Sequence, residues 1–125
     1  MLTRRKDPIA VALEAAGLSS HAARRLATFG TAVTVDEGFT LCREGEIGTQ
    51  AFVLVEGEAV VRLRDGDRIA GPGEVLGEMA VLAPSATRMA NVETTMRSTV
   101  LVYDVRTFRG LAASHKELLS PPRAA

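Results

Sequence analysis

The chain has 125 residues and a formal net charge of zero, because 15 acidic side chains balance 15 basic ones. Hydrophobic residues make up 46% of it and charged residues 24%, which indicates one globular domain with a modest core. The zero balance gives no electrostatic support for nucleic-acid binding, and we interpret the short basic stretch at residues 3–6 as a solvated tail.

The single cysteine, Cys42, excludes an internal disulfide, and its apolar surroundings favour a small buried side chain over a reactive thiol. The sequence lacks the clusters of thiolates or imidazoles that iron–sulfur and structural zinc sites need, so we expect neither a metal nor a cofactor. No segment reaches the apolar length of a membrane span, and Asp7, Pro8, Glu14 and Gly17 interrupt any signal-peptide core. We therefore predict a cytoplasmic protein with no membrane partner.

Residues 1–30 are predicted to form two short helices. Asp7-Pro8 is a helix start, with aspartate as the cap and proline in the first turn, and Gly17 ends the helix. Ser19 or Ser20 can cap the second helix, which Gly30 closes. Apolar residues at helical spacing predict the buried faces, namely Ile9, Leu13 and Ala16 in the first helix and Ala22, Ala23, Leu26 and Ala27 in the second.

Residues 31–105 change to short runs of Val, Ile, Leu and Thr that are cut by glycines. The runs are TAVTV, TLCR, AFVLV, AVVRLR, RIA, EVL and finally STVLVYDV. The DGD stretch at residues 65–67 predicts a hairpin turn, and repeated Gly-Glu pairs at Gly45, Gly57, Gly73 and Gly77 mark further corners. Many short, closely spaced strands predict a mainly β domain, an antiparallel sandwich or small barrel with flanking helices.

Residues 106–120 return to helical periodicity. Thr107 is the expected cap, and Ser120-Pro121-Pro122 ends the helix. The apolar positions recur at Phe108, Leu111, Ala112, His115, Leu118 and Leu119. The whole of residues 1–125 is thus interpreted as one domain.

The segment at residues 73–90 holds the strongest functional signal. Gly77 is followed by EMAVLA, a predicted one-turn helix inside a β domain, and a helix start after glycine presents free N–H groups to an anion. Arg88 returns ten residues after Glu78. A guanidinium facing a helix start suits a phosphate, and an inward carboxylate suits a neutral hydroxyl such as that of a ribose.

Two plainer interpretations compete with an anion pocket. Glu78 and Arg88 can be ordinary surface residues, or they can form an internal ion pair that satisfies both groups without a ligand. Spacing alone favours these two alternatives, but neither explains a glycine-led helical turn embedded among strands.

The stretch GEVLGEMAVL…TRMA resembles the phosphate-binding cassette of cyclic nucleotide-binding domains, the family of the catabolite activator protein and the protein kinase A regulatory subunits. The matching positions are Gly77, Glu78, Ala80, Leu82, Arg88 and Ala90, and Leu76 replaces the family's usual Phe. The resemblance covers almost the whole chain, and it implies an antiparallel β-roll or jelly roll, the double-stranded β-helix.

The resemblance also implies the role of each site residue. Arg88 would hold the exocyclic oxygens of a cyclic phosphate, and backbone N–H groups near Glu78, Met79 and Ala80 would complete the cradle. The Glu78 carboxylate would accept a hydrogen bond from the ribose 2′-hydroxyl. Apolar contacts to sugar and base would come from Val61 and Leu76.

Two departures from the family pattern shape these expectations. Met89 stands where the family usually has Ala, Ser or Thr, so no hydroxyl is available there to bond phosphate or guanine, and cyclic AMP is favoured over cyclic GMP. The sequence after Leu119 is predicted to lack both the family's long lid helix and a DNA-binding helix-turn-helix.

Three classes of function follow from the sequence. The leading one is a cyclic nucleotide sensor without chemistry of its own, which a protein effector or a homodimer partner would read. The second is a degenerate domain that acts as a protein-interaction module without nucleotide. An enzyme is disfavoured, because His21 and His115 lie in the helical ends and no nucleophile–base arrangement stands out.

Overall fold

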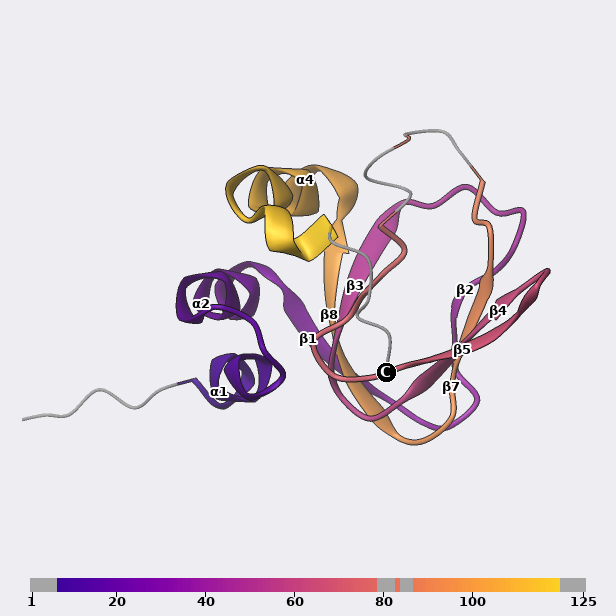
Figure 1. The fold of residues 1–125 in the computed structure, drawn as a ribbon, viewed down its shortest axis with the longest axis horizontal. Coiled ribbons are helices and arrows are strands. Elements are labelled where there is room, and N and C mark those ends of the chain that lie inside the picture. Colours follow the sequence, from indigo (N-terminus) through magenta and orange to yellow (C-terminus); the bar gives the residue numbers. More distant parts are fainter. Residues whose placement is uncertain (1–6, 79–82, 84–86, 120–125) are drawn as a thin grey trace, which may run out of the picture.

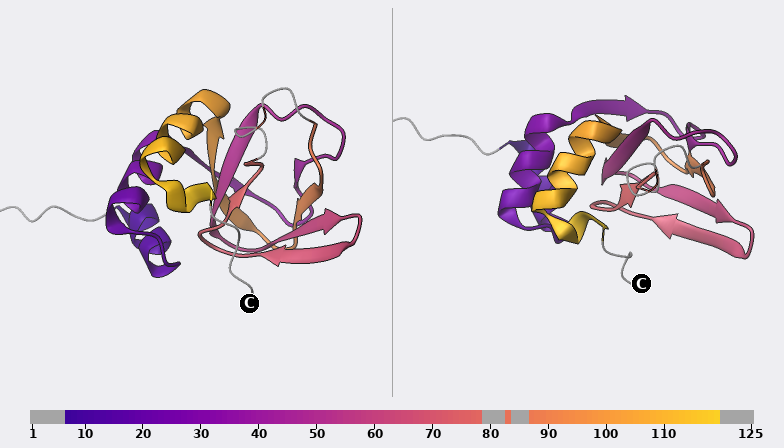
Figure 2. Two further views of the ribbon diagram at one scale, coloured as in Figure 1. Left: turned by 45° about the horizontal axis from the view of Figure 1, so that its top comes forward. Right: turned by 90° about the horizontal axis from the view of Figure 1, so that it is seen from above.

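The structure, a computed structural model, describes residues 7–78, 83 and 87–119. In chain order the helices and strands are α1 (Pro8–Ala15), α2 (Ser20–Phe29), β1 (Thr31–Val35), β2 (Thr40–Cys42), β3 (Gln50–Glu56), β4 (Ala59–Leu63), β5 (Gly66–Ala70), β6 (Val75–Leu76), β7 (Asn91–Thr94), β8 (Ser98–Asp104), α4 (Val105–Ser114) and the 3-10 helix η1 (Lys116–Leu119). The helices gather at one side of the strands (Figure 1; Figure 2).

The two N-terminal helices begin at the predicted caps. The Asp7 carboxylate accepts a hydrogen bond from the Ile9 N–H at 2.8 Å, and the Ser19 hydroxyl oxygen accepts one from the Ala22 N–H at 3.2 Å. The predicted apolar faces are buried or half-buried except at Ala16, which is exposed because it lies beyond the last residue of α1.

The described strands form two four-stranded antiparallel sheets. Their strand orders are β1-β8-β3-β6 and β2-β7-β4-β5. This confirms the predicted antiparallel β-roll, and the four Gly-Glu corner glycines all have positive φ. The β4–β5 hairpin turns one residue earlier than predicted, because Leu63 pairs with Gly66 and leaves Arg64 and Asp65 as the turn.

Two apolar cores lie on the two faces of the sheet that contains β3, the first core on the side of the helices and the second core on the side of the other sheet. The side chains of Ala51, Val53 and Val55 face α1, α2 and α4, whereas Phe52 faces the second sheet. Burial on both sides of β3 explains its continuous apolar run, in contrast to the alternation of strands with one wet face. The sheet is therefore the central layer between the helices and the second sheet.

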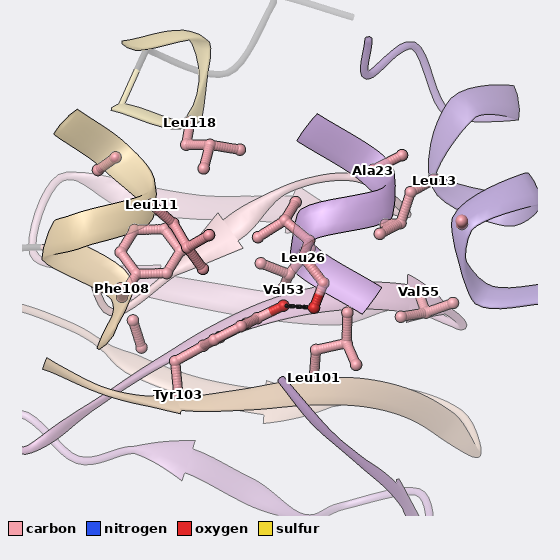
Figure 3. Close-up of a cluster of buried hydrophobic side chains, with 13 residues drawn as sticks. Leu13, Ala23, Leu26, Val53, Val55, Leu101, Tyr103, Phe108, Leu111 and Leu118 are labelled. Atoms are coloured by element: carbon pink, nitrogen blue, oxygen red, sulfur yellow. Dashed lines mark hydrogen bonds between the residues drawn. The ribbon is translucent and has the colours of Figure 1, made fainter. Parts of the chain in front are cut away.

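Tyr103 of β8 links that strand to α2 in the first core (Figure 3). Its hydroxyl donates a hydrogen bond of 2.6 Å to the Leu26 carbonyl, and burial raises the pKa of this phenol far above its usual range. The residue that ends α2, Gly30, lies so close that a Cβ there would be 2.5 Å from the Tyr103 ring. The sequence signal of Gly30 as a helix stop thus coincides with a packing requirement.

The C-terminal helical region differs from the prediction in two ways. The cap of α4 is Asp104 and not Thr107, because the Asp104 carboxylate follows β8 directly and accepts hydrogen bonds from the Thr107 N–H at 2.7 Å and the Thr107 hydroxyl at 3.1 Å. The helix expected over residues 106–120 ends at Ser114, and η1 follows after His115, whose backbone is not helical.

Candidate functional site

A cavity of about 220 Å³ opens beside the second core. The structure brings most of the residues predicted for the site to its wall, namely Val61, Leu76, Gly77, Glu78, Arg88, Met89 and Ala90. The other two predicted residues, Met79 and Ala80, and the helical turn expected there, lie outside the described residues. Residues from β2, β4, β5, β6 and β7 line the cavity, so both sheets contribute to it.

Arg88 is held in place through its main chain and its side chain. Its N–H donates to the Glu46 carbonyl at 2.7 Å, and its own carbonyl accepts from the Gly45 N–H at 2.9 Å. The guanidinium donates from Nη1 to the Gly77 carbonyl at 3.1 Å and from Nη2 to the Gln50 carbonyl at 2.8 Å. A guanidinium has five N–H groups, so these two bonds orient it and leave donors for an anion.

Gly77 is required for this approach of the guanidinium. Its φ of 78° lies in the left-handed region, and a Cβ there would be 2.5 Å from Arg88 Nη1 and 3.2 Å from the Gln50 carbonyl oxygen. The missing side chain at Gly77 thus lets the Arg88 guanidinium reach the backbone.

Glu78 is half-buried at the cavity wall, and no ion pair between described residues joins it to Arg88. The buried thiol of Cys42 lies in the electrostatic range of both groups. Burial raises the pKa of Cys42 most strongly, while Arg88 lowers that pKa and Glu78 raises it. The described residues do not form the internal ion pair that was the alternative, and no hydrogen bond among them involves the Glu78 carboxylate.

The floor of the cavity is apolar. Val61, Leu76, Val92 and Cys42 are each less than a tenth exposed, and the burial predicted for Cys42 is confirmed. Met89, by contrast, is 65% exposed at the rim. The cavity thus joins a cationic and an anionic group to an apolar wall, a combination that suits an amphipathic small molecule.

Sequence reasoning missed four lining residues and one strand. The residues are Cys42, Leu63, Arg68 and Val92, and the strand is β7. Cross-strand alternation could have found Arg68, because Val61 opposes Arg68 and Ala59 opposes Ala70 in the β4–β5 hairpin. The strand β7 has one fully apolar position, Val92, in four residues, which is too short a pattern to signal a strand.

The two histidines lie away from the cavity, on the helical side. The rings of His21 and His115 meet edge to face with centroids 5.0 Å apart, and Arg25 Nη1 lies 3.3 Å from His115 Nε2. Within the part of the chain that the structure describes, no three His, Cys, Asp or Glu side chains are grouped so as to hold a metal ion. None of the described helices has the length and apolar character needed to cross a membrane.

The fold and the cavity together define the class of the protein. It is an antiparallel β-roll with flanking helices and with a cavity that both sheets line. The family model for the cyclic nucleotide-binding domain matches residues 32–115, and the chain belongs to that family.

Two curated relatives share the domain but are much longer proteins. The Pycsar effector protein PaPycTIR of Pseudomonas aeruginosa is 32% identical over 94 residues, which cover 74% of this chain and 30% of that protein. A cyclic nucleotide-gated potassium channel of Rhizobium etli is 36% identical over 87 residues, or 67% of this chain and 23% of the channel. The chain thus spans less than a third of either relative.

Solved structures share the fold. A protein kinase A regulatory-subunit domain bound to the cyclic AMP analogue Sp-2Cl-cAMPS superimposes with a TM-score of 0.71 at 22% identity, covering 88% of this chain and 74% of that one. A cyclic nucleotide-binding-like protein from Brucella abortus gives a TM-score of 0.63 at 25% identity, covering 86% of this chain and 99% of that one.

Proposed function

We propose that this chain binds a cyclic nucleotide, with cyclic AMP as the first candidate, and acts as a regulatory module without catalytic activity of its own. The observation that carries the proposal is the Arg88 guanidinium, held against Gly77 by two backbone carbonyls and placed in one cavity with Glu78. Family membership and the relatives named above support the same ligand class.

Each part of the cavity matches one part of such a ligand. The remaining N–H groups of Arg88 would bind the exocyclic oxygens of the cyclic phosphate. The Glu78 carboxylate would accept a hydrogen bond from the ribose 2′-hydroxyl, and Val61 and Leu76 would contact sugar and base. The N–H groups of Met79 and Ala80 remain part of the proposed phosphate cradle.

The preference for cyclic AMP over cyclic GMP rests on residue 89. Met89 lines the cavity but offers no hydroxyl to the phosphate or to guanine. Replacing Met89 with threonine would supply that hydroxyl, so Met89→Thr is the variant that examines the preference directly.

Regulation would follow from a change in the helices that a partner reads. The helix α4 starts directly after β8, the strand that pairs with β3, and β3 pairs in turn with β6 beside Gly77. A ligand that contacts Gly77 and Glu78 would therefore act on the strands that carry α4, and a protein effector or a second copy of the chain would bind according to the position of that helix.

The first test is calorimetric titration of the purified chain with cyclic AMP and cyclic GMP at one salt concentration. We expect micromolar or tighter binding of cyclic AMP, about −8 kcal/mol. The variant Arg88→Ala should bind about 30-fold or more weakly, about 2 kcal/mol, because a charged partner of the phosphate is lost.

Arg97→Ala is the matched control. The Arg97 side chain is 76% exposed and pairs with Asp36 at 3.6 Å. Arg97 follows the end of β7, whereas Arg88 precedes the start of that strand, so the loss of Arg97 should leave the affinity for cyclic AMP unchanged. Equal affinity of wild type and Arg88→Ala would refute the assignment of the phosphate site. Absence of binding in the folded wild type, together with nucleotide-independent capture of a protein partner, would favour the interaction-module alternative.

A further inference from the structure

The two sheets of the described residues end in four edge strands, β1, β6, β2 and β5. An edge strand leaves backbone N–H and C=O groups without a strand partner, and proteins guard such edges with short length, bulges or charged side chains. The strand β6 has 2 residues, β2 has 3 and a register shift in its pairing with β7, and β5 carries Asp67 and Arg68. Among these four edges, β1 is the one without such a guard.

The strand β1 is open on the side away from β8. Its 5 residues, TAVTV, include no charged residue, proline or glycine, and they pair with β8 in one unbroken register. Residues 31–34 are all exposed, and the apolar side chain at their centre, Val33, is 39% exposed. Alternate residues of an antiparallel strand direct both backbone groups to the same side, so part of the N–H and C=O groups of β1 point away from β8. This edge can therefore pair with a further antiparallel strand.

The charges that flank β1 have opposite signs at its two ends. Before the strand, the Arg25 guanidinium lies over the exposed ring of Phe29, 5.8 Å from the ring centroid. After the strand come two exposed acidic residues, Asp36 and Glu37. Asp36 pairs with Arg97 at 3.6 Å, and no ion pair between described residues involves Glu37. The strand thus has a basic, aromatic end and an acidic end.

We infer that β1 is an interaction surface for a second copy of this chain, with the two β1 strands antiparallel about a two-fold axis at Val33. This arrangement pairs all 5 residues of each strand, and the β1 sheet of one copy continues into that of the other. It brings the two Val33 side chains together at the axis, where a pair of β-branched side chains stabilises a sheet.

The flanking charges favour a second copy over an unrelated strand. Pairing about Val33 sets residue 29 of one copy opposite residue 37 of the other. The Arg25 guanidinium, which lies over Phe29, therefore meets Glu37 of the second copy, and this contact occurs twice by symmetry. The described cavity wall includes no residue of β1, so the inference does not rest on nucleotide binding.

Sedimentation velocity of the purified chain at increasing concentration is the experiment. We expect the chain to pass from monomer to dimer between about 1 and 500 μM, because pairing of short strands makes a small interface. In Val33→Lys two like charges would meet at the axis, so the dissociation constant of the dimer should rise about tenfold or more. A thermal melt shows whether each variant is folded.

A charge exchange examines the register and serves if Val33→Lys does not fold. Glu37→Arg alone would place two cations together, so the dimer should dissociate about fivefold more readily. Adding Arg25→Glu to this variant restores opposite charges, and we expect most of the lost affinity between the copies to return.

Ile69→Lys is the matched control. Ile69 is 56% exposed on β5, the edge strand of the other sheet, so the same kind of change there should leave the dimer intact. A chain that stays monomeric over the whole range, even one that pairs with an unrelated extended peptide, would overturn the inference. So would a dimer that neither Val33→Lys nor the charge exchange alters. Either result leaves the proposed nucleotide site standing, because these variants lie outside the described cavity wall.

Discussion

Gly77 and Arg88 depend on each other at atomic distance, and this dependence predicts the effect of a single methyl group. In Gly77→Ala the new Cβ would lie 2.5 Å from Arg88 Nη1, so the guanidinium must leave its place between the Gly77 and Gln50 carbonyls. We expect the affinity for cyclic AMP to fall about tenfold or more, measured by calorimetry, in addition to a loss of stability of about 1 to 2 kcal/mol from the left-handed backbone.

Gly38→Ala separates these two effects. The φ of Gly38 is 82°, close to that of Gly77, but nothing lies within 4 Å of a Cβ there. The control should therefore show a similar loss of stability in urea denaturation with no loss of affinity. A Gly77→Ala variant that binds cyclic AMP as well as Gly38→Ala does would show that the guanidinium position is not critical.

At the scale of the element, Asp104 joins β8 to α4, and its charge makes the junction sensitive to acid. The pKa of Asp104 lies below its ordinary value of 3.8. The largest cause is the hydrogen bond from the Thr107 N–H, and the hydrogen bond from the Thr107 hydroxyl is the next. The unfolded chain thus binds the proton more tightly. The stabilisation by this cap is fully present above pH 3.8 and is lost as the pH falls through the lower pKa of the folded state.

Asp104→Asn isolates this contribution, because asparagine is an equally good cap that does not titrate. We expect wild type and Asp104→Asn to have similar unfolding free energies in urea at pH 6. As the pH falls below 3.8 and through the lower pKa of the folded state, wild type should lose more stability than the variant. Parallel curves for the two proteins across this range would contradict the role of the charged cap.

The same junction illustrates what the sequence allows one to predict about elements. Strands with a clear apolar run, such as β3 and β8, and helices with a cap and a glycine stop, such as α1 and α2, are predictable from local signals. The cap of α4 is not predictable in this way. Asp104 is also the last residue of β8, and its carboxylate reaches Thr107 only because the backbone changes direction there. The short strand β7 depends on pairing with β2 and β4, which is a long-range property.

The candidate site divides in the same way. Gly77, Glu78 and Arg88 form a local motif whose spacing carries chemical meaning. Arg68 reaches the cavity only through the register of the β4–β5 hairpin, and Cys42 only through the pairing of β2 with β7. Residues that only strand pairing brings to a site are therefore the ones that local sequence patterns do not predict.

At the scale of the whole molecule, the cavity couples ligand binding to global stability. Its wall is drawn from β6 of the sheet that carries the helices and from β2, β4, β5 and β7 of the other sheet. Unfolding therefore destroys the site entirely, and a ligand that binds only the folded chain must stabilise all of it. At a cyclic AMP concentration 100 times the dissociation constant, the free energy of unfolding should rise by about 2.7 kcal/mol.

Urea denaturation with and without cyclic AMP measures this rise, and Arg88→Ala provides the comparison. At the same nucleotide concentration the variant should gain about 1 kcal/mol or less, because its dissociation constant is expected to be about 30-fold higher. The slope of free energy against urea should stay the same in all four curves, since the ligand adds little to the surface exposed on unfolding. Equal stabilisation of wild type and Arg88→Ala would mean that the nucleotide acts elsewhere on the molecule, and the coupling through this cavity would have to be abandoned.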